Sequence, residues 1–247
     1  MAEASLTLAA DNGAAAPPLG DGPTRQTIPL TGMRGAIARG MTAGWQIPRV
    51  AHSLEADVSA VEAKRATLQA ELGDSVKVTL TAYVLRAAAL TLRAHPRLNA
   101  RVTDKEIELM PDVNIGLAVS LDDGLVVPVL REVDRKPVEE IAREARTLAE
   151  GARNGTLSAG AYQRGTFTIS NLGMTEVERF TPILHAPQAA ILGVTRVIRR
   201  AVVKDDWISI APMMGLHLVF DHRAVDGYPA AAFLGDLKRR LESAEDL

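Results

Sequence analysis

The spacing of apolar and polar positions along the chain predicts several amphipathic helices. The clearest helical period runs from Met33 through Ile37 to Met41, which places these three side chains on one side of a helix. Residues 78–94 carry few charges, so we expect the helix predicted there to be buried. Further helices are predicted over residues 59–73, 138–152 and 231–241.

Short apolar runs rich in β-branched residues and bounded by turn residues predict the strands. They cover residues 50–58, 107–110, 113–120, 126–130, 166–170, 189–199, 207–211 and 214–220. Helices and strands are mixed without strict alternation, and no internal repeat is visible. This order favours a compact α/β sandwich over a doubly wound dinucleotide-binding fold.

The first residues differ in composition from the rest of the chain. Residues 1–27 are rich in Ala, Gly, Pro and Asp and show no sustained period, which is typical of a flexible linker or tail. We therefore expect one folded domain over residues 28–247.

Composition excludes several kinds of chemistry. The 247 residues are 47% hydrophobic with a formal charge of -2, which is ordinary for a globular protein and gives no case for nucleic acid. The absence of cysteine excludes disulfides, thiolate metal sites and a cysteine nucleophile. No glycine-rich phosphate loop or metal-ligand spacing occurs. Without a membrane span or secretion signal, a cytoplasmic protein is expected.

Two short stretches hold the candidate chemistry. His222 follows an apolar strand and precedes Asp226 by four residues, and Gly227 is expected to allow a sharp turn into the last helix. On spacing alone, a proton-transferring histidine and a surface histidine are equally good interpretations. Ser170 ends another strand and is followed by Asn171 in a turn, where a turn-forming role is favoured.

The motif Asp221-His222-Arg223-Ala224-Val225-Asp226-Gly227 resembles the His-x-x-x-Asp-Gly signature of dihydrolipoyl acyltransferases, the core enzymes of 2-oxo acid dehydrogenase complexes. Four further blocks resemble the catalytic domain of that family in the same order. They lie at residues 30–41, 123–129, 165–173 and 186–193. Several blocks in register are far more specific than the histidine motif by itself.

The resemblance implies a chloramphenicol acetyltransferase-like fold, a two-layer sandwich in which helices flank a mixed sheet. It also implies a homotrimer with active sites between subunits. The substrates would be coenzyme A and a dihydrolipoyl thiol carried by a separate domain or protein, without a metal. His222 would be the general base of transthioacylation, and Ser170 would donate a hydrogen bond to the oxyanion.

The resemblance also suggests supporting residues. Asp226 is expected to fix the active-site loop through a salt bridge with Arg34 or Arg39, and the sequence does not decide which. Asn171 is expected to shape the backbone after Ser170. Four residues could line the thiol channel, although their apolar character favours a buried strand: Leu125, Val126, Val127 and Pro128.

Three departures from the family stand out. Neither a lipoyl domain nor a subunit-binding domain is present, which fits a piece of a longer protein or a stand-alone acyltransferase. The chain ends at Leu247, where family members continue with an apolar tail, so we expect a free trimer that builds no larger hollow core. Residues 175–179 are unusually charged, with Glu176 where glycine is common, which puts recognition by that loop in doubt.

Two other functions remain open. An antibiotic acetyltransferase would share the fold and the histidine motif. A pocket for its aromatic drug is expected to be rich in aromatic side chains, whereas only 4% of the residues of this chain are aromatic. Peptide-synthetase condensation domains carry a second histidine where this chain has Asp221. A non-catalytic scaffold is the remaining alternative, and retention of Ser170 and His222 argues against it. The acyl group, whether acetyl, succinyl or branched, is not determined.

Overall fold

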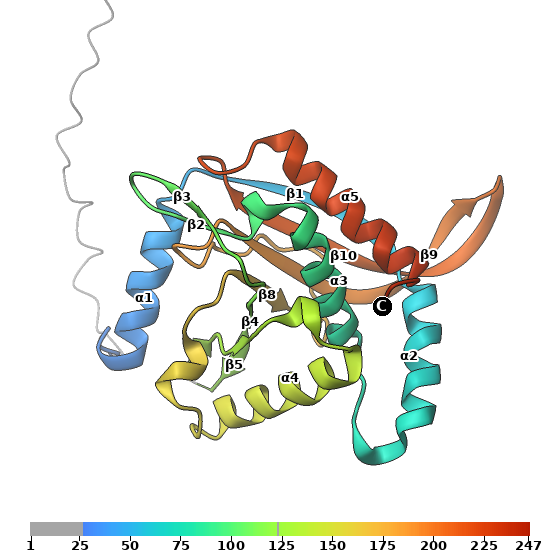
Figure 1. Ribbon diagram of the computed structural model, residues 1–247, viewed down its shortest axis with the longest axis horizontal. Coiled ribbons are helices and arrows are strands. Elements are labelled where there is room, and N and C mark those ends of the chain that lie inside the picture. The colour runs from blue at the N-terminus through green and yellow to red at the C-terminus, as the bar shows by residue number, and fades with distance from the viewer. Residues whose placement is uncertain (1–26, 123) are drawn as a thin grey trace, which may run out of the picture.

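The computed structural model describes residues 27–122 and 124–247 (Figure 1). The predicted linker, residues 1–27, lies outside the described residues except for Thr27. The helices are α1 (Gly32–Trp45), α2 (Ser59–Leu72), α3 (Leu80–Ala94), α4 (Val138–Arg153) and α5 (Gly227–Ser243). Single turns of 3-10 helix are η1 (Gly73–Ser75), η2 (Pro96–Leu98), η3 (Val133–Arg135) and η4 (Ala159–Tyr162).

The strands of the main sheet are β1 (Arg49–Asp57), β4 (Ile115–Leu117), β7 (Val129–Leu130), β8 (Phe167–Asn171), β9 (Ala190–Lys204) and β10 (Trp207–Asp221). Their order is β1-β10-β9-β8-β4-β7. β8 runs parallel to both β4 and β9, and the other neighbouring pairs are antiparallel. Two small sheets pair β2 (Ala100–Val102) with β3 (Ile107–Leu109) and β5 (Val119–Leu121) with β6 (Gly124–Val126). The predicted α/β fold with a mixed sheet is confirmed.

One face of the sheet packs against helices. Side chains alternate along a strand, so Leu216, Leu218 and Phe220 of β10 all point to this face. They are fully buried in one core with Phe233 of α5. Figure 1 shows α3 and α5 lying across the same face. As its low charge predicts, α3 is mostly buried.

A segment without regular structure, residues 178–187, crosses the opposite face of the sheet. Its Leu184 forms a second buried cluster with Ile191 and Val219. Two glycines permit the close packing here. A Cβ on Gly44 of α1 would collide with the Leu184 carbonyl, and a Cβ on Gly193 would lie 2.8 Å from the ring of Phe180. The segment is therefore held against the sheet by steric fit.

Several predicted strand boundaries were wrong. The strand predicted over 126–130 is divided between β6, which ends at Val126, and β7, which begins at Val129, and the strand predicted to end at residue 199 continues to Lys204 as β9. The predicted strand 113–120 divides at Ala118, where the chain leaves the main sheet and joins the β5–β6 pair. The strands predicted over 207–211 and 214–220 are one strand, β10, running through Pro212. β1 pairs with β10 only from Met213 onward, so the missing N–H of Pro212 breaks no ladder bond to β1.

Within the described residues, no single helix is long and apolar enough to cross a membrane. Residues 59–75 and 80–94 would reach that length only as a pair, and they meet at an angle of 118°. The apolar side chains of α3 in that pair are buried in the protein core.

Candidate active site

His222 stands in the short loop between β10 and α5. Its backbone N–H donates a 2.9 Å hydrogen bond to the carbonyl of Pro48, which ties the loop to the start of β1. The imidazole remains 45% exposed, so a substrate can reach it. A half-exposed histidine on a tethered loop is suited to proton transfer at neutral pH.

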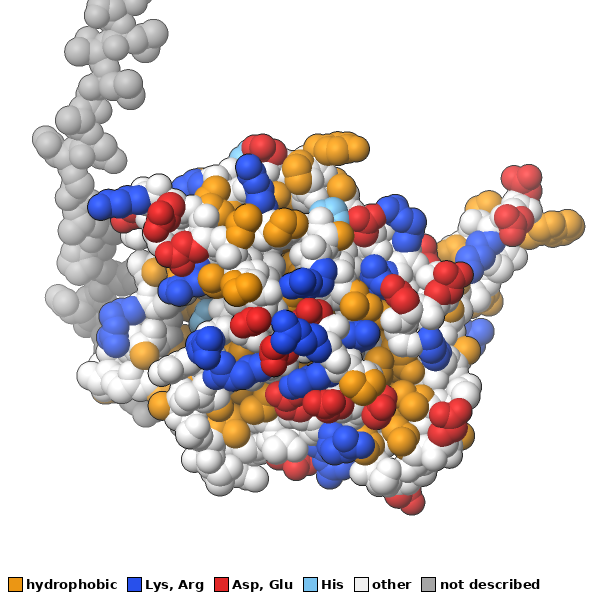
Figure 2. Space-filling model, in the orientation of Figure 1, with side chains coloured by type: hydrophobic (Ala, Val, Ile, Leu, Met, Phe, Trp, Pro, Cys, Tyr) orange, Lys and Arg blue, Asp and Glu red, His pale blue; other side chains and the backbone are white. Residues whose placement is uncertain are grey.

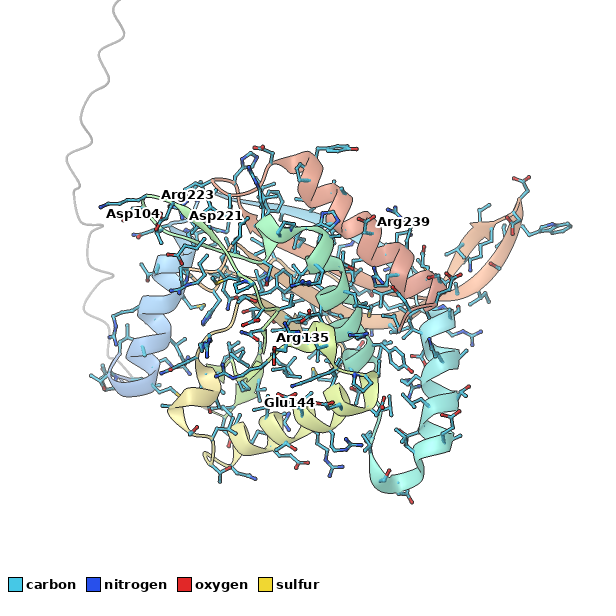
Figure 3. The ribbon with its side chains drawn as sticks, viewed as in Figure 1. Asp104, Arg135, Glu144, Asp221, Arg223 and Arg239 are labelled. Carbon is cyan, nitrogen blue, oxygen red and sulfur yellow. The ribbon has the colours of Figure 1, made fainter. Side chains whose placement is uncertain are left out.

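Asp221 and Arg223 fix this loop, a role that the sequence reasoning missed. The fully buried carboxylate of Asp221 accepts hydrogen bonds from the backbone N–H, Nε and Nη2 of Arg223. Figure 3 shows the two residues side by side, with Asp104 close to them. The sequence held one signal for this role, because Asp221 directly follows an apolar strand. A carboxylate that is buried at the end of such a strand requires a charged or hydrogen-bonding partner.

Asp226 faces the histidine. One of its oxygens lies 4.0 Å from His222 Nδ1, and its side chain is 79% exposed. Among the described residues, the ion pair of Asp226 is with His222, and the expected salt bridge with Arg34 or Arg39 is not formed within the chain. The ion pair that the structure does show in this loop joins Asp221 to Arg223.

Gly227 does not make the sharp turn that was expected of it. It is the first residue of α5, and its φ lies outside the left-handed region. An added Cβ would meet only His52, at an ordinary contact distance of 3.8 Å. The conformation therefore does not require glycine here, and the turn is made by the loop residues before it.

Ser170 lies near the end of β8, half-buried, on the sheet face opposite the helices. It pairs with Gly193 of β9, which in turn pairs with His217 of β10. β10 continues four residues beyond His217 and ends at Asp221, directly before His222. That offset is about 13 Å along the strands and about 10 Å across them, so Ser170 and His222 of one chain do not share a site.

Asn171 holds the turn after Ser170. Its side-chain oxygen accepts a 2.6 Å hydrogen bond from the N–H of Gly173, and its Nδ2 donates to Thr81 Oγ1 of α3 at 2.8 Å. The end of β8 is thereby tied both to its own turn and to the helical layer. This arrangement fixes the backbone that carries Ser170.

The four residues predicted to line a thiol channel are divided between strand β6 and the segment that follows it. Leu125 and Val126 lie in β6, where Leu125 is exposed, and Val127 and Pro128 follow that strand. Val127 lines a cavity of about 470 Å³ at the end of β8 remote from Ser170. This cavity is also bordered by cationic and polar side chains, among them Arg101, Arg164 and Gln188.

The charged loop 175–179 is held by β9. Arg196 forms ion pairs with Glu176 and Glu178, and Arg200 pairs with Glu178. The hydrogen bond from Arg196 is the largest cause that lowers the pKa of Glu178. The unusual charge of the loop is therefore matched by arginines of the neighbouring strand.

His217 of β10 is buried, and its polar partner is the exposed Ser53 of β1. Its Nδ1 lies 2.8 Å from Ser53 Oγ, and its ring lies 6.0 Å from that of Phe180. Burial is the main cause that lowers the pKa of His217. No group of three histidine, aspartate or glutamate side chains in the described part of the chain is placed to hold a metal ion.

Comparison with known proteins gives a consistent picture. The family model for 2-oxoacid dehydrogenases acyltransferase (catalytic domain) matches residues 22–247. The dihydrolipoyllysine-residue acetyltransferase component of the acetoin cleaving system of Bacillus subtilis is 40% identical over 88% of this chain and 55% of its own length. The lipoamide acyltransferase component of the branched-chain alpha-keto acid dehydrogenase complex of Pseudomonas aeruginosa is 38% identical over 88% and 52%. The chain thus spans about half the length of these curated relatives.

Solved structures agree with the fold. Dihydrolipoamide acetyltransferase from Azotobacter vinelandii superposes with a TM-score of 0.85 at 34% identity, covering 89% of this chain and 92% of that one. A chloramphenicol acetyltransferase superposes with a TM-score of 0.51 at 13% identity, covering 87% and 99%. The second likeness shows the fold alone.

Proposed function

Because the chain belongs to the family of 2-oxoacid dehydrogenase acyltransferase catalytic domains, we propose that it transfers an acyl group between coenzyme A and a dihydrolipoyl thiol. His222 is the general base and Ser170 the oxyanion donor of this reaction. These relatives are components of an acetoin cleaving system and of a branched-chain alpha-keto acid dehydrogenase complex, so they do not agree on one acyl group. An assay with several acyl groups decides which one this chain transfers.

The spacing of three residues carries the proposal. In the Azotobacter vinelandii acetyltransferase, a serine, a histidine and an asparagine were investigated for their role in the catalytic mechanism. That serine precedes the histidine by 52 positions and the asparagine follows it by four, the spacing of Ser170, His222 and Asp226 here. This chain differs in having a carboxylate at the third position.

Proton transfer is the task of His222. The thiolate is the nucleophile, and a free thiol is mostly protonated at neutral pH. Because Nδ1 is turned toward Asp226, Nε2 is the nitrogen that accepts the proton of the attacking thiol. As the first sulfur–carbon bond forms and the second breaks, the same nitrogen returns the proton to the leaving thiol. No covalent enzyme intermediate is required.

Ser170 stabilises the charge that develops between these two steps. Attack on the thioester converts the carbonyl oxygen into an oxyanion, and the Ser170 hydroxyl donates a hydrogen bond to it. The fixed backbone after β8, held by Asn171, keeps this donor in place before the substrate arrives. A donor of this kind typically contributes about 3–4 kcal/mol to transition-state stabilisation.

The active site lies between copies of the chain. A general base must come within about 3 Å of the proton that it removes. Within one chain the strand register separates Ser170 from the His222 loop by about 13 Å along β10 alone. The proposed site therefore takes His222 from one subunit and Ser170 from its neighbour in a homotrimer. A lipoyl carrier domain and 2-oxo acid dehydrogenase enzymes are the proposed partners.

An assay of acyl transfer from short acyl coenzyme A thioesters to free dihydrolipoamide tests the proposed reaction. We expect His222→Ala to lower kcat by about 10²–10⁴-fold and Ser170→Ala by about 10²–10³-fold. The control is Ser120→Ala, which removes an exposed hydroxyl from β5. Inactivity of the unmodified protein with every acyl group, or full activity of His222→Ala, would refute the proposal.

Subunit exchange tests the shared site. Ser170→Ala and His222→Ala proteins are each expected to be inactive, whereas an equal mixture should recover about a quarter of the wild-type rate, because random assembly into rings completes that share of sites. The double variant Ser170→Ala/His222→Ala, mixed with either single variant, is the control and should recover nothing. A mixture of single variants that stays inactive after verified exchange would place each site within one chain.

A further inference from the structure

The cavity at the start of β8 is lined by groups that the proposed reaction does not use. Its volume of about 470 Å³ is within the range of small-molecule sites. Thr166 lies on its wall and precedes Ser170 by four residues of extended chain, which is about 13 Å along the strand. The cavity is therefore separated from the residue proposed to stabilise the oxyanion.

Arg164, on the wall of this cavity, has a backbone conformation that favours glycine. Its φ is 67°, in the left-handed region. Asn114 Nδ2 donates a 3.1 Å hydrogen bond to the Arg164 carbonyl, which helps to hold the backbone in this conformation. A long cationic side chain retained at such a position points to a role for that side chain at the cavity.

The cationic groups of the cavity have donors to spare. Figure 2 shows Lys and Arg side chains lying beside Asp and Glu over the face in view. Arg164 departs from this pattern, because its guanidinium forms no hydrogen bond or ion pair within the part of the chain that the structure describes. Arg101 lines the same cavity, and its ion pair with Glu108 is 3.9 Å long. Both guanidinium groups can therefore bind an anion.

Gln188 adds a buried donor to the cavity wall. The residue is only 4% exposed, and its Oε1 accepts a 2.6 Å hydrogen bond from Thr168 Oγ1. Its Nε2 is turned away from Thr168, and no group of the described residues accepts a hydrogen bond from it. A Cβ at Gly165 would lie 3.0 Å from this nitrogen, so glycine leaves room for the amide. Because a buried donor without a partner is costly, we expect a ligand atom to accept from it.

The rest of the wall determines which kind of anion fits. Val127, Val129 and Met110 supply apolar surface, which suits a ligand with a hydrocarbon body better than an inorganic anion. Asp112 is the one carboxylate among the described residues of the wall, and it would repel a second negative charge. These properties favour an anion with a single charge and an apolar body.

We propose that this cavity binds a small organic monocarboxylate. Arg101 and Arg164 hold the carboxylate through charge-assisted hydrogen bonds, and Gln188 Nε2 donates to one of its oxygens. The hydrocarbon body lies against the two valines. This site goes beyond the proposed function, because it uses neither Ser170 nor His222.

An NMR titration with phenylbutyrate tests the site without any acyl transfer. The unmodified protein should bind phenylbutyrate at least about tenfold more tightly than phenylbutyramide, which has the same body without the charge, or inorganic phosphate. No binding of phenylbutyrate, equal binding of the neutral amide, or tighter binding of phosphate would overturn the proposal. Displacement of phenylbutyrate by coenzyme A would overturn the separation of this site from acyl transfer.

Arg164→Gly distinguishes binding from folding. Glycine suits the observed φ, so the unfolding temperature should not fall. The affinity for phenylbutyrate should nevertheless decrease about 10–100-fold, the value of charge-assisted hydrogen bonds. Arg153→Ala, which removes an exposed arginine from the end of α4, is the control and should leave the affinity unchanged. An Arg164→Gly protein that binds phenylbutyrate as tightly as wild type would overturn the proposal.

Gln188→Glu supplies a second variant at the buried donor. Glutamate keeps an acceptor for Thr168 Oγ1 but replaces the amide donor with a negative charge or a protonated oxygen. The affinity for phenylbutyrate should fall about tenfold or more while circular dichroism remains native-like. Undiminished binding by this folded variant would show that Gln188 does not contact the carboxylate.

Discussion

At the scale of single residues, the ion pairs that involve a buried carboxylate say more about the stability of the fold than the exposed charges do. Asp57 is almost fully buried and accepts hydrogen bonds from Lys204 and from the Ser59 backbone N–H and hydroxyl. Burial raises the pKa of Asp57, but the hydrogen bonds from Lys204 and Ser59 outweigh it, so the pKa is lowered.

The lowered pKa of Asp57 makes its contribution to stability dependent on pH. That contribution is fully present above the pKa of an unfolded aspartate, about 3.9, and is lost as the pH falls through the lower pKa of the folded state. Asp57→Asn should therefore cost about 1–3 kcal/mol at neutral pH, the value of hydrogen bonds to a charged group. Urea unfolding from pH 6 down to pH 2 should show that cost shrinking below pH 4. Asp74→Asn, which changes an exposed carboxylate, should show no such trend.

Asp226 allows a test of what the neighbour of His222 must supply. The 4.0 Å between Asp226 and His222 Nδ1 is longer than a hydrogen bond, but a small closing movement would let an aspartate or asparagine oxygen accept one from Nδ1–H, whereas alanine cannot. Asp226→Asn should keep kcat within a fewfold of wild type, and Asp226→Ala should lose about fivefold or more, as expected for one hydrogen bond. The pH profile of kcat/KM provides the second readout. Equal losses in both variants would show that the charge matters and the hydrogen bond does not.

At the scale of elements, the sequence predicted all five helices because apolar residues recur at helical spacing in each. The strands were harder, since a short apolar run has the same character in one strand or two. The turn Asp205-Asp206 joins β9 to β10 with both residues in the left-handed region. It lacks the Asn-Gly or Asp-Gly pair that signals a hairpin, so the sequence did not reveal the long β9–β10 hairpin.

Substitutions at two glycines of α1 distinguish the effect of side-chain packing on stability from the effect of helix propensity. Gly44 lies against the backbone carbonyl of Leu184, which cannot move aside easily, whereas a Cβ on Gly40 would meet nothing within 4 Å. Gly44→Ala should lower the free energy of unfolding by about 1–3 kcal/mol through overpacking. Gly40→Ala should raise it by about 0.5–1 kcal/mol, because alanine favours the helix. Chemical denaturation of both variants checks the contrast, and a stabilised Gly44→Ala protein would contradict the observed packing.

At the scale of the whole molecule, the sequence predicted the mixed sheet and the family but not the internal geometry of the site. Family resemblance named His222 and Ser170 by their motifs. Their separation depends on the register Ser170–Gly193–His217, which arises from pairing between residues distant in the chain. The anchoring of the loop by Asp221 and Arg223 was missed for a related reason, because burial of a carboxylate cannot be seen without its surroundings.

A site built from two chains makes activity depend on protein concentration. Specific activity should fall on dilution as copies separate and should return when the protein is concentrated again. Measuring initial rates over a dilution series, with light scattering at each concentration, checks the expectation. A specific activity that stays constant while the assembly dissociates would contradict it.

The register that separates Ser170 from the His222 loop also determines how many complete sites an assembly contains. Each head-to-tail junction completes one site, so a lone chain has none, an open pair has one, and a closed ring of three has three. The third subunit therefore adds two sites, one at the junction that it forms on joining and one at the junction that closes the ring. The number of sites per chain therefore rises from none in a lone chain to one half in an open pair and one in a closed ring, so catalytic capacity should increase with each step of assembly.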